Sequence, residues 1–358
     1  MSFSTSRREF LKTTTAGAYA LMTAPRLPAQ TAGPPMRVRG INHVTLSVSD
    51  VKRSVDFYQG LFGMSVISRQ GSATNLQIGA GPQFLGVSAA GSDPPRFDHL
   101  SLGVEDFDVE RVSRILTQYG VTRVDSAAGT GGGGLSGGPM KMRIRMRGSD
   151  AGGAQEGTPE LYVGDPNGFV IQLQDPRYCG GAGMLGNMCP AREPSPRRGL
   201  LALRGWSHCT NNVSDAAASR KFCQDLFGLR IQAYQGPTAP VFGLGGGVEF
   251  LMFTAGAAGR GGSGAAPRAA INHLCMTLEN FRTETVIKAL ETYGIKPRGD
   301  GQGPPGPLVH YISVRRDDRG GAKEGTPELY FTDPDGLPIQ LQDVSYCGGS
   351  GVLGNVCI

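Results

Sequence analysis

The chain has 358 residues, of which 39% are hydrophobic and about 22% are glycine or proline. This length is enough for about two domains with sizeable cores, and the composition indicates a globular, loop-rich protein. The formal net charge is only +5, and part of it lies near the N-terminus. We therefore exclude a dedicated nucleic-acid-binding protein, which would carry a larger and clustered basic excess.

Residues 1–32 have the pattern of an export signal. A basic patch precedes a weakly apolar stretch and a small-residue cleavage site at Leu27-Pro28-Ala29. The run SRREFLK from Ser6 to Lys12 resembles the twin-arginine export motif, with a basic amphipathic helix as the alternative. No run of about 18 apolar residues follows, so no membrane span is predicted. We expect a periplasmic or secreted protein whose partner during export is the twin-arginine translocation machinery.

Seven cysteines fit an oxidising compartment. Cys179 and Cys189 lie ten residues apart, and Cys347 and Cys357 repeat this spacing in nearly identical surroundings. We predict two short-loop disulfides from these pairs. A cysteine metal site is the alternative, and the absence of Cys-x-x-Cys spacing disfavours it. The other three cysteines are expected to be small core residues; they are Cys209, Cys223 and Cys275.

The chain contains a long internal repeat. Residues 157–189 align without gaps on residues 325–357, with 23 identities in 33 positions. Repetition over this length predicts two homologous domains in tandem. We place them at residues 37–190 and 204–358, joined by a proline- and arginine-rich linker at 191–203.

Each domain divides again into two similar units that begin with a short histidine motif. The four motifs lie at residues 40–43, 97–99, 205–208 and 271–273. A helix follows each motif, as the shared face of Val51, Val55, Tyr58 and Leu61 shows for the first unit. Strands then follow, and Asp-Pro-x-Gly hairpin turns at 165–168 and 333–336 join the last two of them. The sequence therefore predicts that each unit consists of a strand, a helix and about three further strands.

Four of the five histidines occupy the same position in the four units: His43, His99, His208 and His273. Because side chains alternate along a strand, each histidine shares its face with a small residue two positions on, opposite an apolar face. The last strands likewise place a glutamine opposite isoleucine and leucine. The strands before them place a glutamate and a tyrosine on one shared face. We expect these polar faces to converge on a cavity.

These features resemble the vicinal oxygen chelate superfamily, which includes glyoxalase I, fosfomycin and bleomycin resistance proteins, and type I extradiol dioxygenases. The resemblance covers residues 37–358 and rests on residues 43–63, on the Asp-Pro-x-Gly turns and on the fourfold layout. It implies an α+β fold of two tandem domains, each a pair of βαβββ modules that form a cup-shaped sheet. It also implies a divalent metal, iron(II) first, with manganese or zinc as alternatives. The partner would be a small-molecule substrate with vicinal oxygens.

Carried over residue by residue, the resemblance implies two sets of metal ligands. They are His43, His99 and Gln172 in the first domain and His208, His273 and Gln340 in the second. The strands before the last ones offer catalytic candidates of their own, tyrosines as proton donors and, where they point inward, glutamates as bases. These are Tyr162 and Glu160 in the first domain, and Tyr330 and Glu328 in the second.

The sequence differs from extradiol dioxygenases at two kinds of site residue, and two hypotheses about the function therefore remain. Those enzymes end their signature with a metal-binding glutamate, where this chain has Gln172 and Gln340, and they carry a catalytic histidine where this chain has Gly-Gly-Ala. The four histidines favour an exported metal-dependent enzyme, a dioxygenase or a glyoxalase-type lyase or isomerase. The glutamines favour a metal-free small-molecule-binding protein like those that confer bleomycin resistance.

Three arginines alternate along one predicted strand: Arg143, Arg145 and Arg147. They could hold an anionic substrate, but the matching residues of the second domain are Tyr311, Ser313 and Arg315. Because only the last arginine is repeated, we interpret these residues as a solvated strand face.

Overall fold

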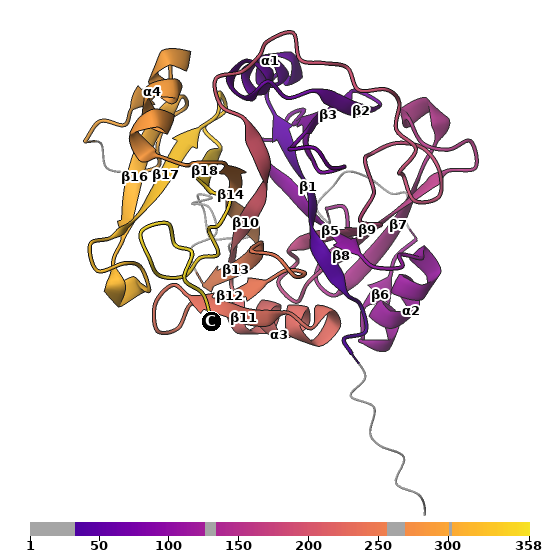
Figure 1. Ribbon diagram of the computed structural model, residues 1–358. Coiled ribbons are helices and arrows are strands. Elements are labelled where there is room, and N and C mark those ends of the chain that lie inside the picture. Colours follow the sequence, from indigo (N-terminus) through magenta and orange to yellow (C-terminus); the bar gives the residue numbers. More distant parts are fainter. Residues whose placement is uncertain (1–32, 126–133, 256–268, 301–302) are drawn as a thin grey trace, which may run out of the picture. The chain divides into compact units, whose positions relative to one another are not determined.

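The structure is a computed structural model that describes residues 33–125, 134–255, 269–300 and 303–358 (Figure 1). The predicted export signal at residues 1–32 lies outside the described residues. Residues 34–358 form one unit that contains two nine-stranded sheets. No helix within the described ranges is long and apolar enough to cross a membrane.

The first sheet has the strand order β2-β3-β4-β1-β5-β9-β8-β7-β6. Its strands are β1 (Val38–Val48), β2 (Val66–Gln70), β3 (Ala73–Gln77), β4 (Phe84–Ala89), β5 (Arg96–Val104), β6 (Thr122–Arg123), β7 (Lys141–Arg147), β8 (Thr158–Gly164) and β9 (Val170–Gln174). Helix α1 (Val51–Phe62) follows β1 and helix α2 (Val109–Gln118) follows β5. The first strands of the two units, β1 and β5, are antiparallel neighbours (Figure 1).

The second sheet repeats this topology in the order β11-β12-β13-β10-β14-β18-β17-β16-β15. Its strands are β10 (Leu203–Val213), β11 (Arg230–Tyr234), β12 (Pro240–Gly243), β13 (Phe250–Ala255), β14 (Ala270–Leu278), β15 (Lys296–Pro297), β16 (Val309–Arg315), β17 (Thr326–Thr332) and β18 (Pro338–Asp343). Helices α3 (Ala216–Phe227) and α4 (Thr283–Tyr293) follow β10 and β14. The second unit of each domain has one strand more than predicted, because two residues after its helix pair in parallel with the next strand.

The helices begin and end as local sequence chemistry requires. The Asp50 side chain accepts a hydrogen bond from the Arg53 amide at the start of α1, as an N-cap residue does. Gly63 ends the same helix with φ of 67°, a left-handed conformation that glycine adopts without steric strain. Tyr58 and Leu61 on the predicted face are fully buried. The predicted first helix is therefore confirmed, with its apolar side packed in the core.

The Asp-Pro-x-Gly turn of the second domain contacts helix α1 of the first. Asp333 accepts a hydrogen bond of 3.1 Å from the Tyr58 hydroxyl, and Asp335 accepts one of 3.1 Å from the Ser49 amide. Amides at a helix N-terminus lack partners within the helix, so this turn supplies an acceptor from the other domain.

The turn of the first domain makes the reciprocal contact with helix α3. Asn167 Oδ1 accepts a hydrogen bond of 2.8 Å from the Asp215 amide, and Asp165 accepts one from the Ser219 hydroxyl. The repeated turns thus hold the two domains together, a role in addition to joining the last two strands.

Both predicted disulfides are confirmed. Cys179 bonds to Cys189, and Cys347 bonds to Cys357. The three remaining cysteines are buried, as predicted; they are Cys209, Cys223 and Cys275.

Candidate metal centre

The repeated histidines form two pairs, one pair in each sheet. His43 on β1 and His99 on β5 approach each other with ring centroids 5.4 Å apart and ring planes at 86°. His208 on β10 and His273 on β14 have the same separation, with ring planes at 85°. Because the first strands of paired units are neighbours in each sheet, the two histidines of a domain face one common point.

A glutamine from the last strand of each domain completes these clusters. Gln172 Oε1 lies 3.1 Å from the Nε2 atom of His43 and 2.9 Å from that of His99. Strand β9, which carries this glutamine, runs parallel to β5. The structure therefore brings together the three side chains proposed as ligands of the first domain.

In the second cluster the inner nitrogens of the two imidazoles contact each other. The Nε2 atoms of His208 and His273 lie 3.3 Å apart. The Gln340 side chain is 1% exposed, and neither atom of its amide has a hydrogen-bond partner among the described residues. A buried amide without partners is unfavourable, so a ligand that engages its oxygen would relieve this state.

The residue directly before each histidine holds the other ring nitrogen. The partners of Nδ1 are Asn42 at 2.8 Å, Asp98 at 2.9 Å, Ser207 at 3.0 Å and Asn272 at 2.8 Å. Each of these four residues is skipped in the pairing register of β1 with β5 or of β10 with β14. Such β-bulges turn an extra side chain toward its neighbour. Our sequence reasoning missed this role, although a polar residue before all four histidines was a readable signal.

Asp98 determines which nitrogen of its neighbour carries the proton. Burial opposes ionisation of this carboxyl, but the hydrogen bond with His99 keeps the pKa of Asp98 below its ordinary value. An ionised carboxylate only accepts hydrogen bonds, so the proton of His99 lies on Nδ1. Its Nε2 lone pair then faces the cluster, as metal-binding histidines require.

Three of the four histidines, His43, His208 and His273, are held in their neutral form. Burial lowers the pKa of His43 and His208 well below the ordinary value, and it lowers the pKa of His273 to about 4. Neutral imidazole is the form that coordinates metals. Phe84 stacks on His43 at a centroid distance of 4.3 Å, and Phe250 stacks on His208 at the same distance, which further orients the rings.

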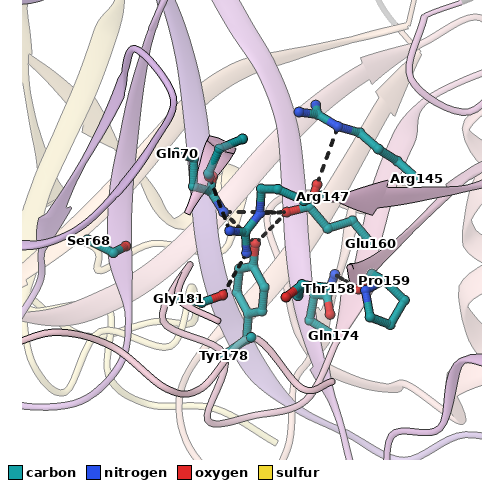
Figure 2. Close-up of polar contacts among 12 residues, drawn as sticks. Ser68, Gln70, Arg145, Arg147, Thr158, Pro159, Glu160, Gln174, Tyr178 and Gly181 are labelled. Atoms are coloured by element: carbon teal, nitrogen blue, oxygen red, sulfur yellow. Dashed lines mark hydrogen bonds and ion pairs between the residues drawn. The ribbon is translucent and has the colours of Figure 1, made fainter. Parts of the chain in front are cut away.

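A buried ion pair lies near each histidine pair. In the first domain, the Nε atom of Arg147 lies 2.6 Å from Glu160 Oε1, and the Tyr178 hydroxyl donates a hydrogen bond of 2.8 Å to the same oxygen (Figure 2). Arg147 also donates a hydrogen bond of 2.8 Å to the Gly181 carbonyl. The interpretation of Arg147 as part of a solvated strand face is therefore wrong. A carboxylate and a carbonyl satisfy its guanidinium inside the protein.

The second domain repeats this cluster with Arg315, Glu328 and Tyr346. The Arg315 Nε atom lies 2.8 Å from Glu328 Oε1, to which Tyr346 donates a hydrogen bond of 3.1 Å. Tyr178 and Tyr346 also pack near His43 and His208, with centroid distances of 5.5 and 5.6 Å. Sequence reasoning did not select these tyrosines, although both lie in the repeated 33-residue segment.

The candidate tyrosines lie beside the second histidine of each pair. The ring centroid of Tyr162 is 5.4 Å from that of His99, and the centroid of Tyr330 is 5.2 Å from that of His273. Burial, followed by the nearby glutamate, raises the pKa of both tyrosines well above the ordinary value. Both phenols therefore stay protonated near neutral pH. Tyr162 donates a hydrogen bond of 3.1 Å to Glu160.

The donor sets fit a divalent metal. No three His, Cys, Asp or Glu side chains cluster suitably for a metal within the described ranges, and the side chain that lies with the two histidines in each domain is an amide. Two imidazole lone pairs that face each other repel unless a cation lies between them, and an amide oxygen also accepts a hard cation. Three protein donors leave positions open for a substrate.

A family model and a curated relative match the first domain. Residues 40–173 match the Glyoxalase/Bleomycin resistance protein/Dioxygenase superfamily. The chain is also 33% identical over 89 residues to "Glutathione transferase FosA" of Serratia marcescens. That match covers 24% of this chain and 63% of the relative, so the chain spans less than two thirds of that protein.

Solved structures match both domains. The Mn(II)-bound glyoxalase from Novosphingobium aromaticivorans matches with a TM-score of 0.56 at 14% identity, covering 86% of this chain and 82% of that one. A catechol 2,3-dioxygenase matches with a TM-score of 0.53 at 15% identity, covering 88% of each chain. Homoprotocatechuate 2,3-dioxygenase from Brevibacterium fuscum, in complex with 3,4-dihydroxyphenylacetate, matches with a TM-score of 0.54 at 17% identity, covering 87% of this chain and 83% of that one. The predicted fold of two tandem vicinal-oxygen-chelate domains is confirmed.

Proposed function

We propose that this protein is an exported metal-dependent enzyme of the glyoxalase or extradiol dioxygenase type, with one metal centre in each domain. The main support for this proposal is the arrangement of His208, His273 and Gln340 in the second domain. The Nε2 atoms of His208 and His273 lie 3.3 Å apart, and the buried amide of Gln340, which makes no hydrogen bond of good geometry, interacts with both rings. The Asn272 side-chain oxygen accepts a hydrogen bond from Nδ1 of His273, so the Nε2 lone pair of this ring faces His208, where a cation would bind.

The protein side chains around each centre have distinct roles in this proposal. A bound divalent metal would supply a Lewis acid that polarises the vicinal oxygens of a small substrate. Tyr162 and Tyr330 stay protonated and serve as hydrogen-bond or proton donors beside His99 and His273. Glu160 positions Tyr162 by accepting its hydrogen bond, and a role as base would require it to leave the Arg147 ion pair.

Iron(II) is the metal we propose first, with manganese(II) and zinc(II) as alternatives. Two histidines and one oxygen donor with open positions suit iron(II) in oxygen-dependent enzymes. A neutral amide in place of a carboxylate removes one negative charge from the inner ligands, so binding should be weaker than at a centre with glutamate. The related structures include a Mn(II)-bound glyoxalase, which supports a divalent metal in general.

The metal content of the purified protein tests this proposal. We expect about two equivalents per chain by elemental analysis, after purification without chelators or a histidine tag. The double variant His43→Ala/His99→Ala should retain one equivalent, and so should His208→Ala/His273→Ala. His310→Ala is the matched control, because this histidine contacts Glu291 at 3.3 Å, outside both clusters. Metal near zero, with none taken up from anaerobic iron(II), would favour a metal-free binding protein instead.

We further propose that the protein is exported by the twin-arginine route and functions in the periplasm or outside the cell. The run SRREFLK near the N-terminus and the two disulfides support this location, because disulfides persist in oxidising compartments. Mass spectrometry of the mature N-terminus tests it. Cleavage near residue 30 that is lost on Arg7→Lys/Arg8→Lys substitution is expected, and an intact Met1 on exported protein would contradict it.

A further inference from the structure

A cavity of about 1060 Å³ lies beside the histidine pair of the first domain. Its wall includes Asp98 and Tyr162, and both contact His99, the first through a 2.9 Å hydrogen bond and the second through ring packing. The same wall includes Arg143 and Arg145 of β7. Two guanidinium groups and two side chains that contact His99 therefore line one cavity.

The strand pairing explains why these arginines lie at this wall. Strand β7 pairs with β8 so that Arg143 lies opposite Tyr162 and Arg145 lies opposite Glu160. Arg145 lies 3.9 Å from Glu160, whereas Arg147 lies 2.6 Å from the same carboxylate (Figure 2). One carboxylate therefore faces two guanidinium groups, and Arg147 is the closer of the two.

Arg143 adds a second positive charge without a carboxylate partner. Among the described residues it forms no ion pair, and its Nε atom is buried without a hydrogen bond. Its Nη1 atom donates a hydrogen bond of 3.3 Å to the Gly134 carbonyl. The aspartates of the wall form ion pairs with other arginines: Asp93 and Asp98 with Arg96, and Asp125 with Arg123. No aspartate of the wall therefore pairs with Arg143 or Arg145, and these two guanidinium groups are the ones that a ligand would meet.

The second domain has a different wall at the same strand positions. Tyr311 lies opposite Tyr330 and stacks on it at a centroid distance of 5.2 Å, and Ser313 lies opposite Glu328. Arg298 lies over the Tyr311 ring at 5.4 Å. The two domains therefore share the histidine and glutamine cluster but differ in the side chains that would meet the rest of a substrate.

We propose that the first domain takes a small substrate with an acidic group, whereas the second domain takes a substrate without one. Carboxylate, phosphate and phosphonate share the paired acceptor oxygens that match a planar guanidinium. The inference rests on the proposed function, in which one end of the substrate binds the metal. It adds that the other end of the first domain's substrate carries an acidic group. The glutamine and histidine clusters make the two centres alike, and β7 and β16 make them selective.

Binding of phenylacetate and of its neutral isostere phenylacetamide to the purified full chain tests this inference. Both probes are tested on metal-free protein, where the carboxylate has no metal to coordinate, so the comparison measures the acid preference of the wall. We expect at least about tenfold tighter binding of phenylacetate by titration calorimetry at low salt, as a charge-assisted hydrogen bond contributes. The preference should weaken as salt is raised.

Exchanging the side chains at these two positions of β7 and β16 between the domains tests whether the arginines cause the preference for phenylacetate. Arg143→Tyr/Arg145→Ser should abolish it, and the reciprocal Tyr311→Arg/Ser313→Arg should create a second phenylacetate site. Loss of binding in the first variant could result from misfolding, but a gain of binding in the reciprocal variant could not. The two results together therefore test the inference. Equal affinity for the two probes, or a preference that survives Arg143→Tyr/Arg145→Ser in a folded variant, would overturn the inference.

A second pair of probes separates this inference from the proposed function. On metal-loaded protein under anaerobic conditions, 3,4-dihydroxyphenylacetate should favour the first domain, whereas 4-methylcatechol should bind both domains alike. If the chain takes up no metal but still prefers phenylacetate, the proposed function fails and the acid selectivity of the first domain stands. If metal binds and both catechols bind equally in both domains, the selectivity fails and the metal function stands.

Discussion

The Nε2 atoms of His208 and His273 lie 3.3 Å apart, while the Nδ1 atoms of the same rings face Ser207 and Asn272. This arrangement holds both imidazoles by their outer nitrogens and leaves the inner nitrogens facing each other. It recurs in the first domain, where Asp98 holds His99. The protein thus supplies an oriented pair of ligands and a buried glutamine in each half.

Replacing the glutamine ligand with glutamate should strengthen metal binding. In Gln340→Glu, a carboxylate adds one negative charge next to the cation, and we expect affinity for manganese(II) to rise by about tenfold or more. Competition with a metal-sensitive chelating dye measures this change. Gln118→Glu, at an exposed position on α2, controls for net charge. Unchanged affinity would mean that residue 340 is not a ligand.

The side chain that holds His99 should also affect metal affinity. Asp98→Asn removes the acceptor-only carboxylate that keeps the proton on Nδ1, and such partners typically contribute about 10- to 100-fold in affinity. We expect one of the two equivalents of metal to be lost at a lower chelator concentration, while the second domain retains its own. Asp93→Asn, which also lines the cavity, is the control. Equal loss in both variants would argue against positioning by Asp98.

The buried ion pair makes Arg147 critical for stability. Arg147→Met leaves Glu160 buried without its cation, which should lower the free energy of unfolding by about 3–5 kcal/mol. Arg145→Met should change it by less than about 1 kcal/mol, because Arg145 is half exposed and lies 3.9 Å from the same carboxylate. Denaturant unfolding monitored by circular dichroism measures both values. Similar values for the two variants would contradict the difference in burial.

Stability should fall as the pH rises toward neutrality because of Glu249. Burial raises the pKa of this carboxyl to about 7 in the folded state, where it accepts a hydrogen bond of 2.7 Å from the Ile41 amide. Between about pH 4.5 and pH 7 the folded protein retains a proton that the unfolded chain has released, so the free energy of unfolding decreases across this window. The contribution is roughly 3 kcal/mol.

Unfolding of wild type and Glu249→Gln at pH 5 and pH 8 checks this dependence. The variant keeps an acceptor oxygen for Ile41 but cannot ionise, so its stability should vary less between the two pH values. If the two proteins show the same pH dependence, Glu249 ionises as an ordinary exposed carboxyl does.

The disulfides should be detectable by counting thiols. We expect three reactive thiols in denatured, non-reduced protein and seven after reduction, because two pairs of the seven cysteines are bonded. Cys347→Ser/Cys357→Ser should lower the free energy of unfolding by about 3 kcal/mol, the loop-entropy value for this spacing. Cys275→Ser, at a free buried cysteine, should leave four bonded cysteines and two thiols. Seven thiols before reduction would exclude both bonds.

Much of the fold could be predicted because its signals are local or repeated. The cap at Asp50 and the buried face of Tyr58 and Leu61 follow from helix geometry over a few residues. The pairing of Cys179 with Cys189 follows from a spacing that recurs in the second domain. The histidines and glutamines were found because a repeat places the same residue type at the same point of each unit.

The surroundings of these residues could not be predicted from periodicity. Strict alternation would point Asp98 away from His99, and only a β-bulge in the pairing of β1 with β5 brings the two side chains together. The sequence pattern predicts that Arg147 is a surface residue, whereas in the folded protein Glu160 and the Gly181 carbonyl bind its guanidinium in the interior. These contacts depend on strand pairing and on loops distant in the chain, which a local pattern does not specify.

The amino-acid sequence was sufficient for the two domains, the fourfold unit, the disulfides and the residues that converge on each centre, because repetition and side-chain alternation are properties of the chain itself. The orientation of each imidazole, the burial of the arginine–glutamate pairs and the side chains that face Tyr162 and Tyr330 are determined only when strands distant in sequence are paired. Hydrogen bonds and desolvation act between neighbours in space, and those neighbours exist only in the folded protein.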